Sequence, residues 1–371
     1  MSHSRSLTTL LAAVAALAFV QPVAAHAGTT HAGTPHWLLV VLLVVGFAGL
    51  FVGWRRLSRG ERDLRVGVVA LLGGLLAVLV GGIGLVEIQV TPEVAPAWAS
   101  GGGVINVAVA SLLALGSLVA VRLRWPERPR YVALAFILAV WISYPVVMPN
   151  GGLTNPLGYL VVFAVPVTIA YVFARDGGDR LVRALSDRTS RAVTAATFLL
   201  FSVFFAVSAG TVTLNPDTTA RTAGEAFVRL HPVASPLVYW PAVEFYFPAI
   251  PAAGYVSVGS ALLIGVLGSL VALNAGLVTR QWQTGGAPDS PRAMLGAVTS
   301  SGATACCCCA PAFYAAIGGV FGTAASPVYW AFLDPTSPVG GLFLAASVLL
   351  LVGSAIRYVD TDTCRVPSPE T

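Results

Sequence analysis

Lysine is absent from this 371-residue chain, in which all 21 basic residues are arginine. That absence excludes a phosphate-binding loop with its lysine, a Schiff-base lysine and a lysine general base. Charged residues make up only 10% of the sequence, whereas 56% of it is hydrophobic. Such a composition predicts a multi-pass protein of the cell membrane, with the lipid bilayer as its first partner.

Cysteine is also scarce, but it is unevenly placed. Four of the five cysteines are consecutive, Cys306 to Cys309, and the fifth is Cys364. The arginines are spread over short segments between apolar runs and form no continuous basic face, so neither a nucleic-acid nor a nucleotide partner is expected. The run of cysteines is therefore the strongest indication of function.

The N-terminal residues 1–25 have the pattern of a secretory signal peptide. Arg5 supplies its positive charge, Leu7 to Val20 the apolar stretch, and small residues up to Ala25 the cleavage site. An uncleaved signal anchor is the alternative. Residues 26–35 then form a histidine-containing tail outside the membrane, 36–358 the transmembrane part, and 359–371 a cytoplasmic tail.

The apolar runs after the leader predict an all-α bundle of about nine membrane-spanning helices, each about 20 residues long. Glycine runs such as Gly73-Gly74, Gly81-Gly82 and Gly101 to Gly103 are expected to permit close helix packing. The nine expected spans cover residues 36–54, 66–86, 103–121, 131–148, 157–174, 192–210, 255–279, 293–324 and 339–356.

The arginines give an independent prediction of orientation. With the mature N-terminus outside, 18 arginines fall in the predicted cytoplasmic segments, and only Arg221 and Arg229 fall outside. Positive residues are concentrated on the cytoplasmic side of membrane proteins. The sequence therefore predicts an outside N-terminus and a cytoplasmic C-terminus.

Two segments depart from the regular pattern. The long outside segment 211–254 contains the aromatic residues Tyr239-Trp240, which favour a short helix lying on the membrane surface. The apolar stretch 293–324 exceeds what one straight helix needs to cross about 30 Å of hydrocarbon. Pro311 is the expected position of a break, which places the cysteines beside a helix discontinuity.

Thiolates at such a position favour soft or borderline metal ions of the copper, mercury or zinc type. In an intact helix, Cys306 and Cys309 share one face, whereas unwinding near Pro311 would let adjacent thiols converge. Metal binding can drive deprotonation of a thiol in apolar surroundings. The Cys306/Cys309 spacing is also that of a redox dithiol, so thiol–disulfide exchange stays open.

The string Ser301 to Pro311, with Gly318-Gly319 after it, resembles the first-helix element of bacterial mercuric-ion transport membrane proteins. That element has a vicinal cysteine pair, a proline three residues after the second cysteine, and Leu-Gly at seven residues past the proline. Cys307-Cys308, Pro311 and Ile317-Gly318 stand at these positions. In that family the vicinal pair takes a metal ion from the outer side and passes it to cytoplasmic thiols, and the resemblance implies the same ligand role for Cys307 and Cys308. It covers residues 301–319 only, in a late helix and with two extra cysteines.

Histidines begin each unit of a short repeat directly after the leader. His26 and His31 each precede Ala-Gly-Thr, and His36 follows. Imidazoles bind borderline ions, and cleavage after Ala25 would add a terminal amine beside His26. An incidental repeat in a polar tail is the alternative reading. With these three residues outside, the four cysteines in the membrane and Cys364 inside, the sequence suggests an inward route for a thiophilic metal ion.

Carboxylates are missing from the predicted span interiors, which disfavours a proton- or sodium-coupled transporter. The leading hypothesis is a metal conduit or membrane metal chaperone that works with a metal-donor or metal-acceptor protein. This hypothesis favours a protein that is not an enzyme. Two alternatives stay open: a noncatalytic membrane subunit whose cysteines only pack, and a membrane thiol–disulfide oxidoreductase.

Overall fold

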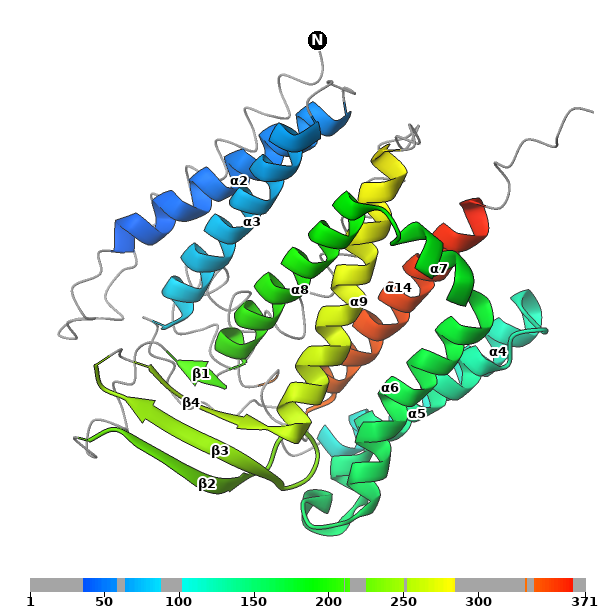
Figure 1. Ribbon diagram of the computed structural model, residues 1–371. Coiled ribbons are helices and arrows are strands. Elements are labelled where there is room, and N and C mark those ends of the chain that lie inside the picture. The colour runs from blue at the N-terminus through cyan, green and yellow to red at the C-terminus, as the bar shows by residue number, and fades with distance from the viewer. Residues whose placement is uncertain are drawn as a thin grey trace, which may run out of the picture.

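The computed structural model describes residues 36–58, 64–87, 102–209, 211–213, 225–249, 252–283, 331 and 337–362. These form a bundle of long helices with one small antiparallel sheet at its end (Figure 1). The long helices are α2 (His36–Ser58), α3 (Leu64–Glu87), α4 (Gly102–Arg124), α5 (Arg130–Val147), α6 (Leu157–Asp176), α8 (Arg188–Ser208), α9 (Val258–Gln283) and α14 (Pro338–Asp362). The shorter elements are η1 (Pro149–Gly152), α7 (Gly178–Ala184), β1 (Val212–Thr213), β2 (Phe227–Val233), β3 (Trp240–Phe247) and β4 (Ala252–Ser257).

Each long helix coincides with one of the predicted spans. Within the described ranges, α4, α5, α6, α8, α9 and α14 are long and apolar enough to cross a membrane. Helices α2 and α3 occupy the positions of the first two predicted spans. The predicted broken helix 293–324 lies outside the described residues. The helical character of the bundle is thus confirmed, with six candidate membrane-spanning helices in the described part of the chain.

The surface helix expected around Tyr239-Trp240 in the predicted outside segment 211–254 is wrong, and the described fold is not all-α. The described residues of that segment form a sheet with strand order β1-β4-β3-β2, all neighbours antiparallel. Along β3, buried Trp240, Ala242 and Tyr246 alternate with exposed Pro241 and Val243. This period of two fits a strand with one face packed and one face exposed. Aromatic residues are as typical of half-buried strands as of membrane interfaces, which is why the pattern misled.

Trp240 fixes the sheet to the helices. Its ring meets Tyr159 edge-on at a centroid distance of 4.8 Å and Phe163 at 5.9 Å, both on α6. The backbone N–H of Tyr239 donates to the carbonyl oxygen of Leu153 at 2.9 Å. The sheet is therefore attached to the turn between α5 and α6 by both apolar and polar contacts.

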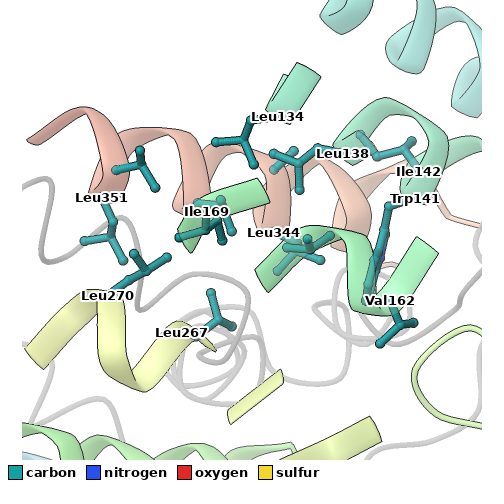
Figure 2. Close-up of a cluster of buried hydrophobic side chains, with 14 of the residues drawn as sticks. Leu134, Leu138, Trp141, Ile142, Val162, Ile169, Leu267, Leu270, Leu344 and Leu351 are labelled. Atoms are coloured by element: carbon teal, nitrogen blue, oxygen red, sulfur yellow. The ribbon is translucent and has the colours of Figure 1, made fainter. Parts of the chain in front are cut away.

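The main core lies where α5, α6, α9 and α14 meet (Figure 2). Leu134, Leu138, Leu267 and Leu351 are completely removed from solvent there. Asn274 of α9 is buried among them, and its amide donates to the carbonyl oxygens of Leu270 and, across the interface, Leu351. Burial of these side chains defines the packing of the bundle, and Asn274 fixes the register of α9 against α14.

Glycines let α2 and α3 approach closely, as the sequence predicted. A Cβ atom added to Gly74 would lie 2.6 Å from the backbone nitrogen of Leu50 and 2.7 Å from the carbonyl oxygen of Gly46. One added to Gly81 would lie 2.8 Å from the carbonyl oxygen of Leu39. Of these two pairs, Gly74 and Gly81 make the close helix contact. No atom lies within 4 Å of a Cβ atom added to Gly73 or Gly82.

The two ends of the bundle differ in charge. Arginines occupy the last turns of α2, α4, α6 and α9 and the first residues of α5 and α8. All these helix ends lie towards the upper right of Figure 1, whereas the sheet lies at the opposite, lower end. We call these the arginine end and the sheet end.

Candidate functional site

The predicted metal ligands fall mainly outside the described residues. Cys306 to Cys309, Cys364, His26 and His31 all lie there, and His36 is the first residue of α2, with its side chain not described. Among the described residues, no group of three or more histidine, cysteine, aspartate or glutamate side chains is placed to hold a metal ion. The predicted ligand set therefore stays a prediction from the sequence.

In the sequence, the cysteine-bearing segment lies between helices α9 and α14. Both begin at the sheet end and finish at the arginine end, so they run parallel (Figure 1). Val348, Leu351 and Val352 of α14 and Leu267 and Leu270 of α9 are buried in the core that these helices share. Residue 283, which ends α9, and residue 338, which begins α14, thus lie at opposite ends of the bundle.

A carboxylate that sequence reasoning missed is buried at the arginine end. The side chain of Asp176, at the C-terminus of α6, is 4% exposed and accepts both Nε (2.7 Å) and Nη2 of Arg130 at the start of α5. Arg128 lies 4.0 Å away as a second cation. A bidentate guanidinium–carboxylate pair is strong and geometrically specific. The pair of Arg130 and Asp176 joins α5 to α6 at the arginine end. Nothing in the sequence indicated that these two side chains are in contact.

Asp187 joins α8 to α9 at the same end. Its carboxylate accepts the backbone N–H groups of Thr189 and Ser190 and the side-chain amide of Gln283, each at 3.0 Å. The first two bonds cap the N-terminus of α8. The hydrogen bonds from Ser190 and Gln283 lower the pKa of Asp187 below its usual value, because they favour the charged form.

The sheet end carries one ion pair among the described residues, between neighbouring strands. Arg229 on β2 donates through Nε to Glu244 on β3 at 2.7 Å, and its guanidinium lies 4.9 Å from the Phe227 ring centroid. The hydrogen bond from Arg229 lowers the pKa of Glu244. His231 is exposed on β2, two residues from Arg229, opposite Ala242. These residues form a polar strip on the sheet.

Comparison with known proteins returned no match to a family model, to a curated protein or to a solved structure.

Proposed function

We propose that this multi-pass membrane protein binds a thiophilic metal ion of the copper, mercury or zinc type within the membrane, as a conduit or metal chaperone. Cys306 to Cys309 are the proposed ligands. The observation that carries the proposal is the placement of four of the five cysteines together in an apolar segment between two membrane-length helices. Thiolates select soft ions over alkali and alkaline-earth ions.

The proposed topology has nine spans after a cleaved signal peptide, with the sheet end outside and the arginine end in the cytoplasm. The parallel course of α9 and α14 supports it, because the chain between residues 283 and 338 has to return from one end of the bundle to the other. One crossing by the predicted span 293–324 accomplishes this. The collection of arginines at one end agrees with the positive-inside rule.

The proposed route for the metal ion runs inward. His26, His31 and His36 supply borderline ligands outside, the four cysteines supply soft ligands in the membrane, and Cys364 supplies a thiol in the cytoplasmic tail. The local resemblance to mercuric-ion transport proteins supports the ligand role of Cys307 and Cys308. A metal-donor protein outside or an acceptor inside would complete the transfer.

Elemental analysis of the purified full chain tests the proposal. Cells grow with added copper, zinc or mercury, and the protein is isolated under reducing conditions as wild type, with Cys306 to Cys309 changed to serine, or with the matched control Cys364→Ser. We expect bound metal in the wild type and the control and its loss in the fourfold variant. Equal metal content in the fourfold variant would remove the proposed site.

The same preparation separates the alternatives. Thermal unfolding and gel filtration verify that the fourfold variant is folded. A metal-free wild-type protein with a reversible dithiol and a defined midpoint potential would identify a thiol–disulfide oxidoreductase instead. A metal-free protein whose unfolding temperature alone falls in the variant would identify packing cysteines.

A further inference from the structure

An open apolar groove lies between the C-terminal turns of α4 and the start of α5. It has a volume of about 750 Å³. Leu118 and Val121 line it from α4, and Val132 and Phe136 line it from α5. Phe136 is 57% exposed, so its ring is available to an occupant of the groove. Two prolines of the connecting turn, Pro126 and Pro129, close its arginine-end side.

One cation, Arg122, lines this groove at its arginine end. The neighbouring arginines have other contacts, since Arg128 and Arg130 face Asp176 and Arg124 lies 5.9 Å from the Trp125 ring centroid. Among the described residues Arg122 forms no ion pair, although Glu127 lies in the connecting turn that follows α4. The groove thus combines apolar walls with one positive charge at its mouth.

The helix that forms one wall is itself mostly exposed. Only 17% of the most apolar stretch of α4 is buried, and the side chains of Leu112, Leu115 and Leu123 are exposed. In a membrane such a surface faces lipid. Exposed Trp125 follows the last turn of α4, a position typical of the level of lipid headgroups. Arg122 therefore lies at headgroup depth, with the apolar walls extending beneath it.

We propose that this groove binds an anionic glycerophospholipid, with an acyl chain between α4 and α5 and its phosphate on the guanidinium of Arg122. A guanidinium can donate two parallel hydrogen bonds to a phosphate, and basic pockets between membrane helices on the cytoplasmic side bind anionic headgroups. The single positive charge favours a headgroup with net negative charge, and the apolar walls favour a ligand with an attached acyl chain. The site depends on the membrane-spanning assignment of α4 and α5, and its lining residues include none of the proposed metal ligands.

Native mass spectrometry of the full chain in detergent tests this site. The protein is mixed with equal amounts of phosphatidylglycerol and phosphatidylcholine that carry identical acyl chains. We expect wild-type protein to retain about fivefold more phosphatidylglycerol, the effect of about one favourable arginine contact. Arg122→Gln should abolish this preference, and Ala133→Trp, which fills the groove without a charge change, should reduce adducts of both lipids.

Arg191→Gln is the matched control, because it removes an exposed arginine at the same end of the bundle on α8, away from the groove. It should keep the preference for phosphatidylglycerol. An equal loss in both arginine variants would overturn the proposal in favour of diffuse attraction to the arginine end. Full displacement of the lipid by an equal concentration of inorganic phosphate would also overturn it, since the acyl chain would then contribute nothing.

Discussion

Asp176 carries a charge on a buried side chain, so its contribution to the stability of the folded protein depends on its ion pair with Arg130. The carboxylate is almost completely covered, and Arg130 neutralises it with two hydrogen bonds. Breaking a buried ion pair by removal of one partner leaves an uncompensated charge, whereas removing both partners does not. The pair therefore determines how α5 and α6 meet at the arginine end.

We predict that Arg130→Met lowers the free energy of unfolding by about 1–3 kcal/mol, because the carboxylate loses two hydrogen bonds while Arg128 stays nearby. The double variant Arg130→Met with Asp176→Leu should recover much of that loss, because no charge is left buried. Denaturant unfolding of the four proteins in detergent, evaluated as a double-mutant cycle, measures both effects. Additive losses in the double variant would contradict a direct pair.

Asp187 makes stability depend on pH in a defined direction. Its pKa is lower in the folded protein, so its stabilising effect is fully present above the unfolded carboxyl value of about 3.9. It is lost as the pH falls further, through the lower pKa of the folded state. Protonation weakens the cap of α8 and the bond from Gln283 together.

We predict that wild-type protein loses thermal stability below about pH 4 more steeply than Asp187→Ser, which keeps a neutral capping oxygen. Thermal unfolding temperatures of both proteins between neutral pH and acid measure the difference. Gln283→Ala, which keeps the cap, should retain most of the acid sensitivity. Parallel curves for wild type and Asp187→Ser would show that this carboxylate does not govern the acid transition.

At the scale of elements, α2 and α3 form a pair held by backbone proximity. Gly46, Gly53 and Gly74 bring the two backbones together, and a Cβ atom at any of them would meet backbone atoms within 3.0 Å. Small residues are the usual means of close helix packing in lipid, where no hydrophobic force joins two helices.

We predict that Gly74→Ala destabilises the protein by about 1–3 kcal/mol through overpacking. At the neighbouring Gly73, no atom lies within 4 Å of the position that a Cβ atom would take, so Gly73→Ala should be neutral or stabilise α3. Thermal unfolding of the two single variants in detergent gives the comparison. Equal destabilisation by both substitutions would mean that helix flexibility, not contact, explains the glycines.

The small antiparallel sheet was not predicted from the sequence. Pro232 and Pro241 disfavour strands, yet they face each other across β2 and β3. Prolines lack the N–H of a ladder bond, but Pro232 lies on the edge strand β2, and Pro241 of β3 lies outside the ladder with β4, which begins at Ala242. The alternation of Trp240, Ala242 and Tyr246 was visible in the sequence, but the neighbouring aromatic residues suggested a surface helix instead. The contacts of Trp240 with α6 required knowledge of the fold.

At the scale of the whole molecule, helix positions were predictable because the membrane imposes length and apolarity on each span. The pairing of Arg130 with Asp176 was not, because hydropathy does not say which helix ends are neighbours. The cysteine cluster, the histidine tail and the signal peptide stay predictions, since they lie outside the described residues. The metal hypothesis rests on the sequence, with the helix directions as support.

The proposed orientation predicts that the sheet is accessible from outside the cell. Leu230, which is 81% exposed on β2, is changed to cysteine in a variant whose five native cysteines are serine. A membrane-impermeant maleimide should label Leu230→Cys in intact cells. The matched position Val182→Cys, 71% exposed on the short helix α7 at the arginine end, should react only after the membrane is opened. The reverse pattern would invert the topology.

The proposed function requires that adjacent thiols in this protein bind a soft metal ion. An anaerobic titration of the reduced full chain with Cu(I) or Hg(II), followed by ultraviolet thiolate-to-metal charge-transfer absorption, tests it most directly. We expect saturable absorption in the wild type that is lost when Cys307 and Cys308 are changed to serine and unaffected by Cys364→Ser. Absorption that never saturates, or that survives replacement of all four clustered cysteines, would contradict it.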